Sequence, residues 1–327
     1  MPYPAGQPAG AAAPSWVAPD AQGDVVWAEQ AGPPAAGRLF DYDAHTRRVA
    51  IVASRYTQSS QRIGLVSLSP RWLVFSTFAG IFDGSQWRIV VHDRQNGQER
   101  VVASSPLGGA GSAQFDLDGD MLVWVQPIVP QGSVIHLQDL RTGRDHILAS
   151  TRVGIYTVLK VNGGQGHAVW EWIRRSNGGV SIDLLLVSLA GGAVHMIADS
   201  ADQPQLAWPR VVYIKRTRLG MGMLVVQDMQ TGRSQQLPIG RDDDLPQITG
   251  SLVVYRSMLL PSFYNPTTGQ HTVLSRPVQY TVKGAPLFDL HVGGGVLAGV
   301  GHDGAGHYIL ALFRLRGVDP LDDVLTC

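Results

Sequence analysis

Residues 114–150 read QFDLDGDMLVWVQPIVPQGSVIHLQDLRTGRDHILAS, and this stretch decides the fold. It divides into four short runs that are rich in apolar or β-branched residues: Gln114–Leu117, Met121–Val125, Ser133–Leu140 and Asp145–Ser150. Polar turns containing Gly, Pro or Asp separate the runs, which is typical of strands joined by short connections. The stretch therefore predicts a four-stranded antiparallel meander.

The same pattern recurs along the chain with a period of about 45 residues, a spacing typical of propellers and related arrays. Its most constant part is the second strand, which ends on an aromatic residue. These strands are GDVVW ending at Trp27, WLVF at Phe75, MLVW at Trp124, HAVW at Trp170, RVVY at Tyr213 and LVVY at Tyr255, with a weaker seventh copy, GVLAGV, at Gly295–Val300.

The turn between the third and fourth strands has its own signature. It reads DRQNG at Asp93–Gly97, DLRTG at Asp139–Gly143, DMQTG at Asp228–Gly232 and NPTTG at Asn265–Gly269. The first side chain can accept hydrogen bonds from the backbone amides of the turn, and the final Gly can adopt the left-handed conformation of a bulged hairpin. Two copies differ. SLAGG at Ser188–Gly192 weakens the cap, and DAHTR at Asp43–Arg47 puts Arg where Gly is expected, so that turn should be strained or built differently.

These repeats predict an all-β fold, a single β-propeller of four-stranded antiparallel blades. Middle strands such as Leu184–Val187 are continuous apolar runs, which need cover on both faces; neighbouring blades in a ring supply it. We expect seven blades over residues 15–316, after a flexible tether rich in Pro, Ala and Gly at residues 1–14 and before a tail at residues 317–327. Six blades are the alternative, because the last copy has no clear fourth strand and Ser15–Ala18 could close the ring instead.

The repeat resembles those of bacterial TolB-like propellers. The segments that carry the resemblance are DGDMLVW with VIHLQDLRTG, within Asp118–Gly143, and TGSLVVY with FYNPTTG, within Thr249–Gly269. The resemblance spans most of the chain and implies architecture more than activity. It implies an extracytoplasmic protein, periplasmic or at the cell surface, whose export signal is absent from this chain and which binds other proteins. The chain has no counterpart of the N-terminal α/β domain of the Tol-system protein, so we expect a different role.

Composition narrows the classes of function. The chain has 327 residues, with 26 basic and 26 acidic side chains, and a net charge of zero argues against nucleic-acid binding. The single cysteine, Cys327, excludes disulfides within the chain and metal sites built from several thiolates. No window approaches 18 consecutive apolar residues, so we expect no transmembrane segment. We expect a monomer.

Motifs for catalysis or cofactor binding are weak. Gly299–Gly304 matches the spacing of a dinucleotide-binding loop, but the strand-like run His307–Phe313 follows where that site needs a helix. FDLDGD at Phe115–Asp120 lacks the glutamate of a helix–loop–helix calcium site and is interpreted as a polar turn. The loop His302–His307 offers two histidines and an aspartate without a spacing that suits a metal. We predict no cofactor and no metal, and we assign no catalytic residue.

One set of charged residues gains meaning from the predicted fold. In a propeller, the loops between the second and third strands lie on the same face as the segments that link successive blades. In the fourth and fifth repeats these loops hold five cations, and nearby linkers hold acids and aromatics. The set comprises Arg174, Arg175, Lys215, Arg216 and Arg218, the acids Asp199, Asp202, Asp242, Asp243 and Asp244, and the loop aromatics Trp172, Tyr156 and Phe82.

This charged face has two interpretations. It is either a solvated surface of mutual ion pairs, each worth little, or a patch for an anionic peptide or polysaccharide. Trp172 either adds stacking contacts or lies in the core.

The function hypothesis that follows is a non-catalytic binding or scaffolding module. It would engage a protein, a peptide or an anionic polymer on the charged face, and it rests on fold-level analogy. Two alternatives stay open. One is a carbohydrate-active enzyme, a lyase or glycosidase, with its site at the central channel. The other is an accessory or sensor domain of a larger surface protein.

Overall fold

The computed structural model describes most of the chain. It covers residues 14–20, 22–29, 37–57, 61–79, 86–105, 113–128, 132–162, 165–176, 179–216, 222–239, 244–250, 252–257, 260–273, 281–282, 285–293, 296–302 and 308–314. Residues 1–13 and 315–327 lie outside these ranges, so the tether and the tail stay predictions.

Six sheets share one plan, in which four consecutive strands pair antiparallel in chain order. The first three sheets contain β1 (Pro14–Pro19), β2 (Val25–Glu29), β3 (Arg38–Asp43), β4 (Arg48–Ile51), β5 (Gln61–Leu68), β6 (Trp72–Ala79), β7 (Arg88–Asp93), β8 (Glu99–Ser104), β9 (Gln114–Asp118), β10 (Met121–Pro127), β11 (Ser133–Asp139) and β12 (Asp145–Thr151). The next three contain β13 (Ile155–Asn162), β14 (His167–Ser176), β15 (Gly179–Ser188), β16 (His195–Asp199), β17 (Ala201–Ala207), β18 (Arg210–Arg216), β19 (Gly222–Asp228), β20 (Ser234–Ile239), β21 (Asp244–Thr249), β22 (Leu252–Ser257), β23 (Leu260–Asn265) and β24 (Gln270–Val273).

The remaining strands form a sheet that departs from this plan. It contains β25 (Thr281–Val282), β26 (Ala285–Gly293), β27 (Val296–His302) and β28 (Tyr308–Arg314), paired in that order. β25 has only two residues and forms a small hairpin with the start of β26. By contrast, β26, β27 and β28 pair along most of their lengths, like the first three strands of the other sheets.

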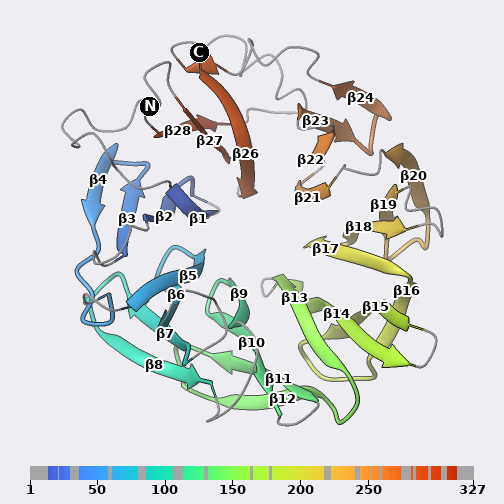
Figure 1. The fold of residues 1–327 in the computed structure, drawn as a ribbon, viewed down its shortest axis with the longest axis horizontal. Coiled ribbons are helices and arrows are strands. Elements are labelled where there is room, and N and C mark those ends of the chain that lie inside the picture. Colours follow the sequence, from blue (N-terminus) through green and yellow to red (C-terminus); the bar gives the residue numbers. More distant parts are fainter. Residues whose placement is uncertain are drawn as a thin grey trace.

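The sheets stand radially around a central axis, with β1, β5, β9, β13, β17, β21 and β26 nearest to it (Figure 1). Each sheet is followed around the ring by the next sheet in the chain. The fold is therefore an all-β β-propeller with six regular four-stranded antiparallel blades, which confirms the predicted propeller of four-stranded blades but not the expected number of seven.

The apolar core lies between neighbouring sheets. The aromatic residues of the repeated motif lie within the second strands and are buried, with Trp27 2%, Phe75 0% and Trp170 0% exposed. One cluster joins the second and third sheets through Trp72, Trp124 and other side chains, and similar clusters join the later pairs. Because each blade buries its faces against two neighbours, the apolar middle strands gain the two-sided cover that their sequence demands.

The first and last sheets also pack together. One cluster combines Val17, Val25 and Trp27 of the first sheet with Val296 and Ala298 of β27. Residues 15–18 lie in β1, which pairs with β2 and so belongs to the first sheet. The ring therefore closes by side-chain packing between the two ends of the described chain.

The turn signature behaves as its residue types predict. Asp139 Oδ1 accepts hydrogen bonds from the backbone N–H groups of Arg141 and Thr142, at 2.8 and 3.0 Å, and Gly143 has a φ of 76°. The glycines of the other matching turns, Gly97, Gly232 and Gly269, have φ values of 71°, 71° and 75°. Arg47 adopts a φ of 57°, so the irregular copy keeps the turn geometry and an L-residue occupies the left-handed position.

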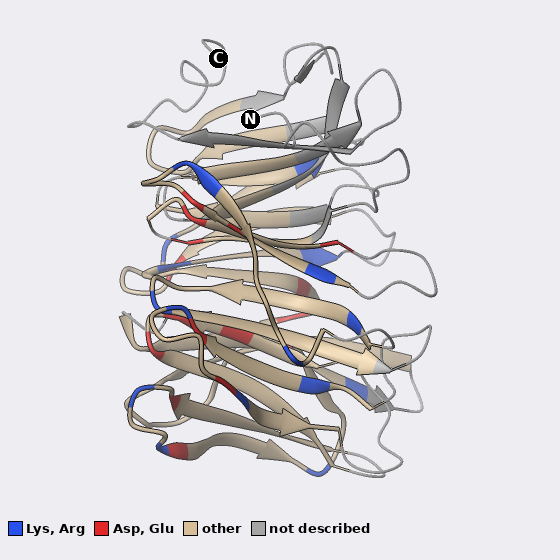
Figure 2. Ribbon diagram, turned by 90° about the vertical axis from the view of Figure 1, so that its left-hand side faces the viewer, with Lys and Arg blue, Asp and Glu red and all other residues tan. Residues whose placement is uncertain are grey.

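Seen from the side, the strands run between two loop-bearing faces, and charged residues gather mainly towards the strand ends (Figure 2). The outermost strands are the most exposed, as in β4 and β12, where Ile51 and Ile147 are 60% and 61% exposed. Ligand sites are therefore to be sought on the two faces or along the axis.

Candidate functional site

The predicted charged face is assembled in part by the fourth and fifth sheets. Lys215 and Arg216 end β18, next to the link from β16 to β17. Lys215 Nζ donates to Asp199 Oδ1 at 3.2 Å, and Arg216 Nε donates to Asp202 Oδ2 at 3.3 Å. The Lys215 ammonium lowers the pKa of Asp199. The link and the hairpin end thus share one face, and these cations are charge-balanced.

Arg174 is also paired. Its guanidinium binds the buried carboxylate of Asp183 and lies 4.5 Å from the centre of the Trp172 ring. The Trp172 indole N–H donates to the carbonyl of Val153 at 3.0 Å. This half-buried ring is therefore fixed by a hydrogen bond as well as by its contact with Arg174. Tyr156, expected among exposed loop aromatics, is 8% exposed and packs edge-on against Trp170. That expectation was wrong because Tyr156 lies in the inner strand β13, between two sheets.

Several members of the predicted set cannot be placed. Phe82, Arg218, Asp242 and Asp243 lie outside the described residues, and for Arg175 and Asp244 only the backbone is described. The described part of this face holds ion pairs that are partly exposed to solvent, and such pairs are worth little each.

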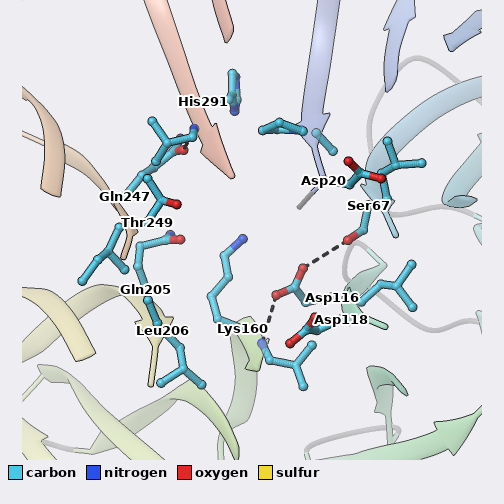
Figure 3. A pocket seen from close by; sticks show the side chains of 18 of the residues that line it. Asp20, Ser67, Asp116, Asp118, Lys160, Gln205, Leu206, Gln247, Thr249 and His291 are labelled. Atoms are coloured by element: carbon cyan, nitrogen blue, oxygen red, sulfur yellow. Dashed lines mark hydrogen bonds between the residues drawn. The ribbon is translucent and has the colours of Figure 1, made fainter. Parts of the chain in front are cut away.

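The axis of the propeller holds a second candidate site that the sequence did not single out. A cavity of about 400 Å³ lies among the inner strands of all the sheets (Figure 3). Its lining includes many polar side chains, namely those of Asp20, Ser67, Asp116, Asp118, Lys160, Gln205, Gln247, Thr249 and His291.

Strand pairing explains how this lining arises. In each of the first six sheets, the residue just before the aromatic of the second strand pairs with one residue of the inner strand, and in the last sheet Ala298 does so. Each of these inner-strand residues lines the cavity. The pairs are Ala18 with Val26, Ser67 with Val74, Asp116 with Val123, Lys160 with Val169, Gln205 with Val212, Gln247 with Val254 and His291 with Ala298. The first members of these pairs are named the channel ring. Residues two positions further on, such as Asp118 and Thr249, share its side of the strand.

Most inner strands carry a register irregularity just before or at the channel ring. The pairing shifts between Thr157 and Lys160 in β13, between Asp202 and Gln205 in β17, and between Asp244 and Gln247 in β21. Such bulges bend a strand and re-aim its side chains. They alter the simple two-residue alternation in these strands, so the ring residues cannot be counted from the strand start.

Hydrogen bonds made by ring residues join neighbouring blades. Asp116 accepts from the Ser67 hydroxyl at Oδ1 (3.3 Å) and from the Val161 N–H at Oδ2 (2.9 Å). On another side of the channel, Gln247 Oε1 of β21 accepts a hydrogen bond from the Val292 N–H of the neighbouring β26 at 2.7 Å. Burial raises the pKa of Asp116, while attraction to Lys160 and the Val161 hydrogen bond oppose that rise.

Three other side chains that line the channel are not engaged in this way in the described structure. Within the described part of the chain, the Lys160 ammonium and the side chains of Gln205 and Thr249 take part in no hydrogen bond or ion pair. These three come from the inner strands of successive blades, β13, β17 and β21, and Lys160 and Gln205 extend into the cavity (Figure 3). This side of the channel therefore offers an ammonium, an amide and a hydroxyl to a ligand.

A buried carboxyl group lies apart from the channel, where the fourth sheet meets the fifth. Glu171 of β14 is 4% exposed, and its Oε1 accepts the N–H of Gln203 at 2.7 Å. Burial raises the pKa of Glu171 to about 7; the Gln203 hydrogen bond opposes the rise and the charge of Asp202 adds to it. This group titrates near neutral pH and couples neighbouring blades.

The channel residues left a signal in the sequence. Phe115–Asp120 was interpreted as a polar turn, and Gly119 does turn there with a φ of 60°, but Asp116 and Asp118 line the cavity. Aligning the repeats on their aromatic residues and counting back through each hairpin would have shown that this strand position is polar in five of the first six copies, the exception being Ala18.

No group of three or more His, Cys, Asp and Glu side chains in the described residues is arranged to hold a metal ion. Asp303 and His307, considered above with His302, lie outside those residues. The described residues also contain no helix long and apolar enough to cross a membrane.

No family model matches the chain, and no curated protein matches it at the level of sequence. Solved structures do match. The β-propeller domain of the trilobed protease from Pyrococcus furiosus aligns with a TM-score of 0.65 and 10% identity, over 98% of this chain and 100% of that chain. Oligogalacturonate lyase in complex with manganese aligns with a TM-score of 0.55 and 14% identity, over 94% and 98%.

Puromycin hydrolase aligns with a TM-score of 0.61 and 14% identity over 94% of this chain, which spans only 55% of that chain. TolB from Acinetobacter baumannii aligns with a TM-score of 0.47 and 15% identity, over 70% and 54%, which is too distant to argue for a shared family. At such low identities the similarity concerns the fold alone. The chain therefore shares a β-propeller architecture with proteins whose activities differ from one another.

Proposed function

We propose that the protein is a non-catalytic binding module whose ligand site is the axial channel. The observation that carries this proposal is the polar lining of the channel, supplied blade by blade at one structurally equivalent position. A cavity of about 400 Å³ lies within the size range of small-molecule sites. It suits a small polar ligand or the end of a chain better than a folded partner.

The hydrogen bonding of Asp116 favours binding over catalysis. Both of its carboxylate oxygens already accept hydrogen bonds from the channel wall, from Ser67 and from Val161. A general base needs an oxygen that can reach the proton it removes. Asp116 instead resembles a wall element that holds three neighbouring blades together and gives the channel a negative charge.

The charged face is the weaker candidate for a partner. Its described cations Arg174, Lys215 and Arg216 are each bound to an acid. An anionic partner would have to displace these acids, which reduces the gain from binding.

We also infer that β26, β27 and β28 serve as a seventh blade. His291 of β26 occupies the position in the channel that corresponds to the other ring residues. β26 contacts β1 on one side and β21 on the other, and the packing of Val296 and Ala298 against the first sheet is what a blade in this place requires.

Blocking the channel tests the binding proposal. Gln205→Trp would place a large ring in the cavity, and Gln236→Trp on the exposed outer strand β20 is the matched control. Both proteins and the parent would be screened by ligand-observed NMR against one library of polar fragments. We expect binders that the parent and Gln236→Trp share and that Gln205→Trp loses. A library with no binders, or binders unaffected by Gln205→Trp, would refute the channel as the ligand site, and turnover of a bound fragment would favour the enzyme alternative.

A further inference from the structure

The charges in the channel are separated into two arcs. The inner strand β9 supplies the carboxylates of Asp116 and Asp118, and Asp20, which directly follows β1, supplies a third. The inner strands of the next blades supply an ammonium and neutral hydrogen-bonding groups, of which Lys160 and Gln205 extend into the cavity (Figure 3). The lining is therefore dipolar across the axis, with an acidic arc and a donor arc.

Lys160 is available to an anionic group. The negative charge of Asp116 attracts it, but the two do not form an ion pair, and both oxygens of Asp116 are engaged with Ser67 and Val161. An ammonium that lies in a channel without a close partner is a point charge that a ligand carboxylate can satisfy.

The acidic arc in turn favours a cation. Three carboxylates face one ammonium in this lining, so a ligand that carries only negative charge would be repelled. One oxygen of Asp20, Oδ2, is buried without a hydrogen-bond partner and lies 3.9 Å from the Arg94 guanidinium. Burial raises the pKa of both Asp20 and Asp116, and a ligand ammonium nearby would stabilise their charged forms.

We propose that the channel binds a zwitterionic small molecule of the amino-acid or short-peptide class. The ligand carboxylate lies against Lys160 with support from Gln205 and Thr249, and the ligand ammonium lies towards Asp116 and Asp118. This assignment rests on the proposed binding function and adds the chemical class of the ligand to it.

The test uses three related probes whose charged ends differ: glycylglycine, N-acetylglycylglycine and glycylglycine amide. The first has both charges, the second lacks the ammonium and the third lacks the carboxylate. Calorimetry and ligand-observed NMR with the unmodified protein should show that glycylglycine binds at least tenfold more tightly than either blocked form. Equal binding of all three probes would overturn the zwitterion assignment, and this comparison needs no variant that must fold.

Two variants assign the ends of the ligand. Lys160→Met should weaken glycylglycine and N-acetylglycylglycine about tenfold and leave glycylglycine amide unchanged. Asp118→Asn should show the opposite selectivity. Equal losses for all probes in both variants would contradict the proposed orientation.

The two proposals fail in different ways. If polar fragments bind in a manner that Gln205→Trp abolishes but none of the three dipeptides binds, the zwitterion assignment is wrong and the binding function stands. If neither fragments nor dipeptides bind, both are wrong.

Discussion

Glu171 should make the stability of this protein depend on pH around neutrality. The carboxyl group is 4% exposed and its pKa is raised from 4.5 to about 7, chiefly by burial. In the native state it therefore holds its proton to a higher pH than in the unfolded chain. The stability that this group contributes is fully present below about pH 4.5 and is lost as pH rises through about 7.

The magnitude follows from the size of the pKa change. At about 1.4 kcal/mol per pKa unit, the full effect is about 3.5 kcal/mol, of which about 2.5 kcal/mol is lost between pH 5 and pH 8. Glu171→Gln keeps an oxygen to accept the Gln203 N–H but cannot ionise. The variant should exceed the parent in the free energy of unfolding by about 1 kcal/mol at pH 5 and by about 3.5 kcal/mol at pH 8.

Urea unfolding curves of both proteins at pH 5, 6, 7 and 8 provide the assay. Other titrating groups are common to both proteins, so they cancel in the difference. Asp228→Asn is the control, because hydrogen bonds from the Thr231 backbone and side chain lower the pKa of this exposed carboxyl, and its titration ends below this pH range. A difference between Glu171→Gln and the parent that stays constant from pH 5 to pH 8 would refute the assignment of a protonated native Glu171.

Three further predictions concern the backbone and the charges that hold the blades, and each is checked by urea unfolding. Arg47→Gly should raise the free energy of unfolding by about 1 kcal/mol, because Arg47 adopts a φ of 57° that suits glycine, whereas Arg48→Gly in strand β4 should lower it; a destabilised Arg47→Gly would contradict this. Gly132→Ala should lower the free energy of unfolding by about 2 kcal/mol or more, since the added Cβ would lie 2.5 Å from the Thr151 carbonyl oxygen at a φ of 132°. Gly119 has a φ of 60° and open space around it, so Gly119→Ala should lower the free energy of unfolding by only about 1 kcal/mol. Equal losses in the two variants would contradict the predicted clash. Arg94→Met should lower the free energy of unfolding by about 3 kcal/mol, because Arg94 binds Asp24 at 2.8 Å and Asp41 at 3.0 Å and its side chain is 14% exposed. The control is Arg141→Met: the Arg141 side chain is 64% exposed, so this variant should change the free energy of unfolding by less than about 0.5 kcal/mol. Similar effects of the two substitutions would contradict a stabilising role for the ion pairs of Arg94.

The strands and turns could be predicted closely because they depend on local sequence. In the third repeat the expected strands were 114–117, 121–125, 133–140 and 145–150, and the observed ones are β9 to β12 at 114–118, 121–127, 133–139 and 145–151. Apolar runs, the aromatic residue of the second strand and the Asp-x-x-x-Gly turn all act over a few residues. Their physical effects are the same in any fold that contains them.

The candidate site was less predictable because its residues come from every blade. Asp116 was visible only as part of a polar turn, and Lys160, Gln205 and Gln247 carried no motif. The partners of the predicted cations were also uncertain, since Arg174 pairs with Asp183 across a strand pair while Lys215 pairs with Asp199 at the end of β16. Bulges in the inner strands decide which side chain faces the axis, and such irregularities leave no clear pattern in the sequence.

The sequence by itself determined the repeating unit: a sheet of short antiparallel strands, capped turns and apolar faces that must be covered on both sides. Only the tertiary structure decided what lies at the axis. Asp116 and Lys160 are more than 40 residues apart, and the channel exists only when radially arranged sheets bring their inner strands together. Local propensities fix backbone shape within a repeat, whereas the charge pattern of the channel depends on ring closure and on the register of each hairpin.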